Sequence, residues 1–142
     1  MQIGQNLLAG SRREKMKNDY EGDMREKNIA FLFDGNVCSF KSEIKNPADI
    51  QGELIPGVPE LFKKLCSAGF EITVYSERAA SLAGRKAIVN WLAKNKLIEY
   101  VATVTSNVPI ARCHVDNRAI LYNGDVQTTF WRIINFSIGG RI

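Results

Sequence analysis

Histidine and cysteine are scarce in this sequence. It contains one histidine, His114, and three cysteines, Cys38, Cys66 and Cys113, scattered along 142 residues. A single histidine excludes zinc sites built from several histidines, and the cysteines lack the spacing of metal ligands. Scattered cysteines of odd number are typical of a reduced compartment, so we expect a cytoplasmic protein.

Long hydrophobic runs are also missing. No apolar stretch approaches the roughly 20 residues that a membrane span requires. Residues 1–6 lack the basic start and apolar core of a secretory signal. We therefore expect no membrane segment and no secretion by a signal peptide. The hydrophobic fraction of 45% fits a globular domain with a sizeable core.

Basic residues are in modest excess, but they form no cluster. The formal net charge is +4, and a basic protein slightly favours partners that carry phosphate. Between residues 12 and 27, however, basic and acidic side chains nearly balance, and no nucleic-acid-binding motif is present. We expect no nucleic-acid partner.

The chain divides into a polar N-terminal arm (residues 1–27), an α/β domain (residues 28–135) and an apolar C-terminal tail (residues 136–142). In the arm, three large side chains recur every four residues and predict a weak amphipathic helix. These are Met16, Tyr20 and Met24. Because this stripe is too narrow to form a core, we expect the arm and the tail to contact a protein partner or other copies of the chain.

Within the domain, apolar runs predict strands and helical spacing predicts helices. The expected strands are residues 29–33, 70–75, 100–105 and 113–115, with residues 119–122 as a candidate fifth strand. The expected helices are residues 59–68 and 79–95, and residues 128–135 are expected to form a final short helix or turn. The turn-rich residues 36–56 predict a flap or a hairpin loop. Strands that alternate with helices favour βαβ units and a parallel sheet. The predicted sheet core is Ile29, Phe31, Phe33, Ile72, Val74, Val101, Val104 and Val115.

The apolar residues 28–33 run directly into Asp34-Gly35-Asn36. This pattern predicts a buried strand that ends at a turn carrying one carboxylate, at the end of the strand where α/β sheets bind ligands. It resembles the first motif of the haloacid dehalogenase (HAD) superfamily, a hydrophobic strand followed by Asp-x-Asp-Gly-Thr. Aligned on Phe-Asp-Gly, Asp34 takes the place of the second Asp, Leu32 that of the nucleophilic Asp, and Asn36 that of Thr. In a shifted register, which stays open, Asp34 is the nucleophile.

Further segments resemble the same superfamily in the right order. Residues 52–61 resemble the Pro-Gly start of its first helix. Residues 70–78 resemble its second motif, in which Ser76 takes the place of the hydroxyl that binds the phosphoryl group. Residues 115–120 resemble the fourth motif, with Asp116 retained. The resemblance covers about residues 28–130 and implies a Rossmann-like, three-layer α/β sandwich with a central parallel sheet and a minimal flap.

The resemblance also implies roles for individual residues. Asp34 is catalytic only in the shifted register. Ser76, Asn36 and Arg78 are candidates for binding phosphate or another anion. Asp34 and Asp116 are candidate ligands for at most a weakly bound Mg²⁺.

The departures from the superfamily pattern occur at the positions of its catalytic residues. Leu32 replaces the nucleophile, Asn117 replaces an acid of the fourth motif, and Val108 stands where the third motif needs lysine. Leucine cannot attack phosphorus, and loss of a nucleophile commonly costs several orders of magnitude in rate. We therefore hypothesise a pseudoenzyme that acts as a binding or assembly module, with a phage or virion component as one hypothesis. The alternative is a Mg²⁺-dependent phosphatase or nucleotidase, a phosphoric monoester hydrolase that uses Asp34.

Overall fold

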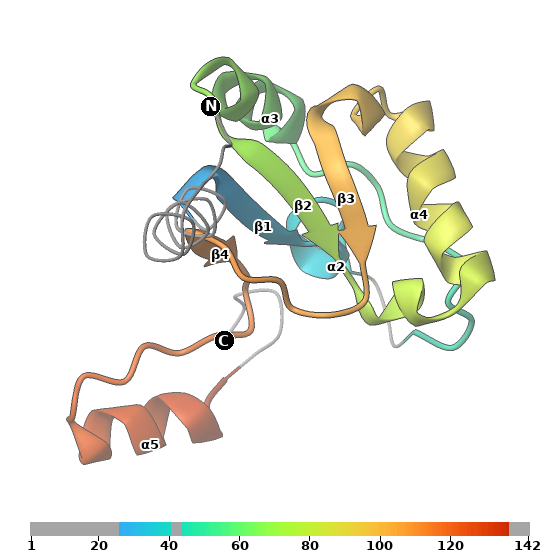
Figure 1. The fold of residues 1–142 in the computed structure, drawn as a ribbon. Coiled ribbons are helices and arrows are strands. Elements are labelled where there is room, and N and C mark those ends of the chain that lie inside the picture. Colours follow the sequence, from blue (N-terminus) through green and yellow to red (C-terminus); the bar gives the residue numbers. More distant parts are fainter. Residues whose placement is uncertain (1–25, 41–43, 137–142) are drawn as a thin grey trace, which may run out of the picture.

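The structure is a computed structural model that describes residues 26–40 and 44–136. Most of the predicted arm, including its apolar stripe, and residues 137–142 of the predicted tail lie outside these ranges. In chain order the elements are β1 (Asn28–Leu32), α2 (Phe33–Asn36), α3 (Val58–Ser67), β2 (Glu71–Tyr75), the 3-10 helix η1 (Glu77–Ala80), α4 (Leu82–Lys94), the 3-10 helix η2 (Ile98–Tyr100), β3 (Val101–Thr105), β4 (Cys113–Val115) and α5 (Val126–Ile134) (Figure 1).

The strands form a four-stranded sheet in the order β3-β2-β1-β4, and every pairing in it is parallel. Ile29 pairs with Ile72 and Phe31 with Val74 across the central strands β1 and β2. This arrangement confirms the predicted Rossmann-like α/β class with a central parallel sheet. Among the described residues, no helix is both long and apolar enough to cross a membrane.

One hydrophobic core joins the sheet to α3 and α4. Alternate residues of β1 and β2 point to one face of the sheet, and there they pack with Phe62 of α3 and with Ile88 and Leu92 of α4. The rings of Phe31 and Phe62 meet edge to face, with centroids 4.8 Å apart. Both crossovers, β1-α3-β2 and β2-α4-β3, step in the same direction, so right-handed connections place both helices on this face.

The predicted sheet core is largely confirmed. Six of its eight members are buried: Ile29, Phe31, Phe33, Ile72, Val74 and Val104. Val101 and Val115 are only partly buried and pack against the core from its margin. They lie on β3 and β4, which are the two edge strands and have a neighbouring strand on one side only.

Two expected elements need correction. Residues 119–122 form no strand, because the chain turns away from the sheet at Asp116, whose Oδ1 accepts a hydrogen bond from the Arg118 amide (2.7 Å). The expected helix over residues 79–95 is divided into η1 and α4. Ser81 lies between them and caps α4, because its Oγ accepts a hydrogen bond from the Gly84 amide (3.0 Å).

In the predicted flap, residues 36–56, the first and last segments lie side by side. Cys38 and Leu54 form an antiparallel bridge, and the Ser39 amide donates to the Glu53 carbonyl (2.8 Å). Gly52 is required at this crossing, since an added Cβ would lie 1.9 Å from the Ser39 carbonyl oxygen. The flap therefore carries Phe40 and Ile44 back toward the end of β1.

Candidate functional site

The carboxyl ends of the four parallel strands meet along one edge of the sheet, above a cleft of about 650 Å³. Parallel α/β sheets bind ligands at this edge, where the connecting loops diverge. The cleft is lined by Leu32, Asp34, Phe40, Ile44, Tyr75, Glu77, Ser106, Val108, Asp116 and Arg118. It therefore combines apolar walls with three carboxylates and one guanidinium group.

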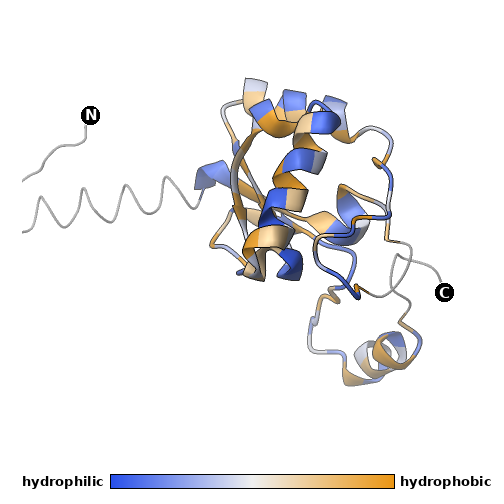
Figure 2. Cartoon of the chain, turned by 90° about the vertical axis from the view of Figure 1, so that its right-hand side faces the viewer, coloured by the Kyte–Doolittle hydropathy of each residue, from blue (hydrophilic) through white to orange (hydrophobic). Residues whose placement is uncertain are grey.

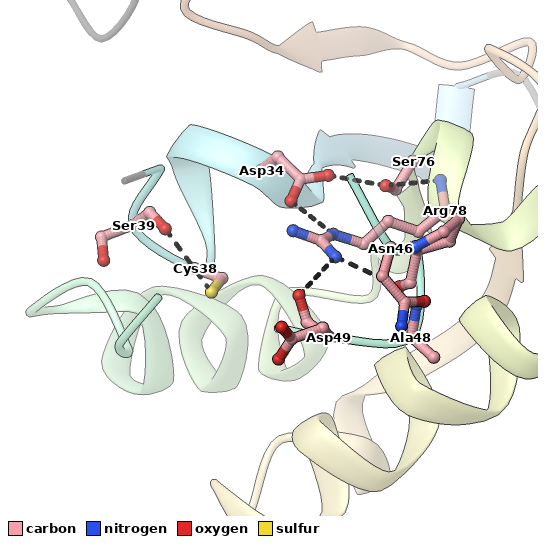
Figure 3. A network of polar contacts seen from close by, with 9 residues as sticks. Asp34, Cys38, Ser39, Asn46, Ala48, Asp49, Ser76 and Arg78 are labelled. Atoms are coloured by element: carbon pink, nitrogen blue, oxygen red, sulfur yellow. Dashed lines mark hydrogen bonds and ion pairs between the residues drawn. The ribbon is translucent and has the colours of Figure 1, made fainter. Parts of the chain in front are cut away.

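Asp34 lies just beyond β1, in a turn that only glycine completes readily, because Gly35 has a φ of 101°. Both of its carboxylate oxygens are engaged by side chains from the end of β2 (Figure 3). The Ser76 hydroxyl donates to Oδ2 (2.6 Å), and Arg78 Nε donates to Oδ1 (2.8 Å). Asp34 is thus an acceptor in a charge-assisted network rather than a free carboxylate.

Arg78 is buried and links Asp34 to the backbone of the flap. The residue is only 7% exposed, and its Nη1 donates to the carbonyl oxygens of Pro47 and Asp49, both at 3.1 Å. Its own amide donates to Ser76 Oγ (3.1 Å). Arg78 therefore fastens the flap to the ends of β1 and β2 and balances the charge of Asp34. Neither Ser76 nor Arg78 lines the cleft.

Asp116 lies beyond β4 and faces β2. The Tyr75 hydroxyl donates to its Oδ2 at 3.2 Å. Burial, together with the charge and hydrogen bond of Asp116, raises the pKa of Tyr75 to about 12. The phenol consequently stays protonated at neutral pH and serves as a hydrogen-bond donor at the wall of the cleft.

Two amides beside Asp34 have buried atoms that make no hydrogen bond among the described contacts. These atoms are Asn36 Nδ2 and Asn117 Oδ1. Asn117 also packs tightly on the turn, since a Cβ added to Gly35 would lie 2.7 Å from its Nδ2. Asn36, a candidate anion ligand from the sequence, does not line the cleft.

The described residues form no preassembled metal centre of three protein ligands. They contain no group of three or more histidine, cysteine or acidic side chains placed to hold a metal ion. Asp34, one of the two predicted ligands, already balances the positive charge of Arg78, which would repel a divalent cation. Asp34 and Asp116 nevertheless line the same cleft, as the parallel topology predicts.

Sequence reasoning missed the ion pair between Asp34 and Arg78 and the cleft-lining roles of Tyr75, Glu77 and Phe40. Arg78 follows Ser76 by two residues, but no spacing rule connects it to a carboxylate 44 residues earlier. The role of the Tyr75 phenol was not predicted, because a residue within an apolar run is expected only to be a buried strand residue. Alternation along β2 does carry the missing signal: Tyr75 and Thr73 point away from the face that bears Val74.

The fold and cleft define a Rossmann-like α/β domain with a mixed apolar and acidic site at the carboxyl ends of its strands. No protein-family model, curated protein or solved structure matches this chain. The resemblance to the HAD superfamily thus stays a prediction that rests on the motifs and their order.

Proposed function

We propose that this chain is a catalytically silent HAD-like domain that acts as a binding or assembly module. The observation that carries the proposal is the state of Asp34, whose two carboxylate oxygens both accept hydrogen bonds from inside the domain. Leu32, at the position of the superfamily's nucleophile, lines the cleft with an inert side chain. Neither position that the superfamily pattern offers for the nucleophile, Leu32 or Asp34, therefore presents a carboxylate that is free to attack.

Attack by Asp34 would disturb the network that holds it. The attacking oxygen would have to give up its present donor, which is Arg78 for Oδ1 and Ser76 for Oδ2. Arg78 is buried, so withdrawal of its partner would leave a guanidinium charge without compensation. A nucleophile is normally activated by its surroundings, whereas these surroundings stabilise Asp34 as a structural anion.

The charges in the cleft also disfavour a phosphate monoester. Three carboxylates line it, those of Asp34, Glu77 and Asp116. Arg78 balances the charge of Asp34, which leaves two carboxylates against the single guanidinium of Arg118. Phosphoryl transfer depends on positive groups around the phosphate oxygens. Val108 supplies no charge at the place of the superfamily's lysine. A neutral or cationic ligand with an apolar part suits this lining better than a phosphate.

The alternative function is a Mg²⁺-dependent phosphatase or nucleotidase, and one observation favours it. Asp34 and Asp116 line the same cleft, which is the arrangement that such an enzyme needs. In this alternative Asp34 attacks phosphorus from the shifted register, and ligand binding would first have to separate it from Arg78.

The two functions are separated by a hydrolysis assay with p-nitrophenyl phosphate and nucleoside monophosphates in the presence of Mg²⁺. We expect no turnover by the wild type. Turnover that Asp34→Asn abolishes, in a variant that keeps its cooperative unfolding transition, would overturn the proposal.

Leu32→Asp tests the register from the other side, with Leu32→Asn as its uncharged, isosteric control. Activity in the aspartate variant alone, or after addition of Val108→Lys, would place Leu32 at the position of a lost nucleophile. If Leu32→Asp gains no activity, with or without Val108→Lys, and the wild type shows turnover that depends on Asp34, the result would support the shifted register.

A further inference from the structure

Asp116 lines the cleft with a charge that no cation balances among the described contacts. Its Oδ2 accepts a hydrogen bond from the Tyr75 hydroxyl (3.2 Å) and its Oδ1 accepts one from the Arg118 amide (2.7 Å), and both donors are neutral. Asp34 differs, because Arg78 balances its charge. Asp116 is half-buried, and a carboxylate that is partly removed from water gains from a cationic partner. The charge of Asp116 is therefore available to a ligand.

The other two unbalanced charges of the cleft have opposite signs. Glu77 and Arg118 both line it, and both residues are exposed to solvent. Neither forms an ion pair with another described residue. Solvent and salt screen exposed charges more strongly than partly buried ones. A ligand in the cleft consequently meets the charge of Asp116 as the dominant one.

The remaining walls of the cleft are largely apolar. Leu32 ends β1, Phe40 and Ile44 belong to the flap, and Val108 follows β3. The volume of about 650 Å³ lies within the range of roughly 300–1,000 Å³ that is usual for small-molecule sites. Such sites combine apolar walls with a few polar groups that orient the ligand. The cleft therefore suits a small molecule with an apolar body and one charged group.

We infer that the cleft binds a small primary ammonium ion that carries an apolar group, and that Asp116 accepts a hydrogen bond from the ammonium. This inference rests on the binding function proposed above and names the ligand class of the same cleft. A carboxylate has about four acceptor positions, and two of those on Asp116 are already occupied. A compact ammonium group needs one of the remaining positions, whereas a guanidinium fork needs both oxygens in a fixed geometry.

The acceptor is held in place before a ligand binds. Tyr75 is 4% exposed, and its ring meets that of His114 edge to face, with centroids 6.1 Å apart. Burial and the charge of Asp116 raise the pKa of Tyr75 to about 12, so the phenol remains a donor at neutral pH. Asp116 thus has a fixed orientation and loses little conformational freedom when a ligand binds.

Titration calorimetry of the full chain at neutral pH with 2-phenylethylammonium chloride tests the inference. 2-Phenylethanol is the matched neutral probe, and 3-phenylpropionate is the matched anionic probe. A hydrogen bond to a charged group contributes roughly ten- to a hundredfold in affinity. We expect the ammonium ion to bind with a dissociation constant on the order of 1 mM or below. It should bind about tenfold more tightly than the alcohol, and the anion should bind more weakly than both.

The backbone amide of Arg118 reports where the probe binds, because it donates to Asp116 Oδ1. Its amide cross-peak in a nitrogen–proton correlation spectrum should shift on addition of the ammonium ion. The Thr128 amide is the matched control, since it donates to Asp125 Oδ1 (3.1 Å), a carboxylate that does not line the cleft. Asp125 caps α5, which Figures 1 and 2 show apart from the sheet. The Thr128 cross-peak should stay in place.

Three variants assign the contributions of charge and apolar area. Asp116→Asn removes the charge and keeps an oxygen acceptor, so it should weaken the ammonium ion about tenfold and change the alcohol less than about twofold. Asp125→Asn is the matched control and should change neither affinity. Leu32→Ala removes apolar area and should weaken both probes severalfold, by similar factors. The comparison of the three probes uses the wild type, so it stays decisive if a variant fails to fold.

Equal affinities of the wild type for the ammonium ion and the alcohol would overturn the inference. An Asp116→Asn variant that binds the ammonium ion like the wild type would do the same, as would shifts of equal size at the Arg118 and Thr128 amides. Mg²⁺ binding that depends on Asp116, in a chain that does not bind the ammonium ion, would assign this carboxylate to the phosphatase alternative instead. The titration contains no phosphate ester, so its failure is distinct from that of the hydrolysis assay.

Discussion

The ion pair between Asp34 and Arg78 should be one of the strongest single contributions to the stability of this domain. The side chains are only 11% and 8% exposed, and the pair joins the end of β1 to the segment that follows β2. Asp34→Ala removes the only anion that faces the Arg78 guanidinium among the described contacts, leaving two carbonyl oxygens as its side-chain acceptors. Removal of one partner from a buried pair costs about 3–5 kcal/mol.

We expect Asp34→Ala to lower the free energy of unfolding by about 3–4 kcal/mol, at the lower end of that range because Asp34 borders the cleft. A domain of this size has roughly 5–15 kcal/mol in total, so the loss is large. Urea unfolding followed by tryptophan fluorescence measures it. Trp91 reports on the core, because its ring meets that of Phe33 edge to face at 5.1 Å.

Asp49→Ala is the matched control. Asp49 also contacts Arg78, but through its backbone carbonyl, which alanine retains. Among the described residues, its carboxylate accepts one exposed hydrogen bond, from Gln51, so this variant should change stability by less than about 0.5 kcal/mol.

A double-mutant cycle isolates the pair itself. Arg78→Met keeps most of the apolar stem and removes the charge, and the double variant with Asp34→Ala should cost about 1–3 kcal/mol less than the sum of the single changes. Equal losses in Asp34→Ala and Asp49→Ala, or strictly additive losses in the cycle, would refute the argument that Arg78 and Asp34 form a structural unit.

Two further predictions concern the cleft and the flap. Because burial and Asp116 raise the pKa of Tyr75 from 10.0 to about 12, the folded state holds this proton more tightly than the unfolded state. The stabilisation from this proton is complete below pH 10 and should be lost as pH rises toward 12. In urea titrations, the free energy of unfolding of Tyr75→Phe should lack this part of the alkaline loss. Identical pH profiles of wild type and variant would contradict the assignment. Gly52→Ala should lower the free energy of unfolding by about 2 kcal/mol or more, since its Cβ would lie 1.9 Å from the Ser39 carbonyl oxygen. Gly57→Ala is the control. Its Cβ meets nothing within 4 Å, so it should cost only about 1 kcal/mol for its positive φ. Equal thermal shifts in the two glycine variants would show that the flap can move aside.

The order of strands and helices was predictable because local patterns determine it. Residues 29–33 and 70–75 are nearly continuous apolar runs, as expected for strands that are buried in a parallel sheet. Amphipathic spacing marked α3 and most of α4. The shared cleft of Asp34 and Asp116 also followed, since parallel strands carry their carboxyl ends to one edge. The false strand over residues 119–122 shows the limit of this reasoning, because an apolar run becomes a strand only when a neighbour supplies hydrogen bonds.

The sequence by itself therefore determined the α/β class, most of the core and the edge of the sheet where polar side chains gather. The tertiary structure alone decided which groups neutralise one another. Arg78 meets Asp34 across 44 residues, and this contact makes a candidate nucleophile a partly buried, paired anion. The tertiary structure also decided which of two similar amphipathic helices is covered: α3 packs Phe62 into the core, while α5 leaves Phe130 and Trp131 exposed. The spacing of apolar residues specifies that a helix has an apolar face, and only the surrounding chain specifies what covers it.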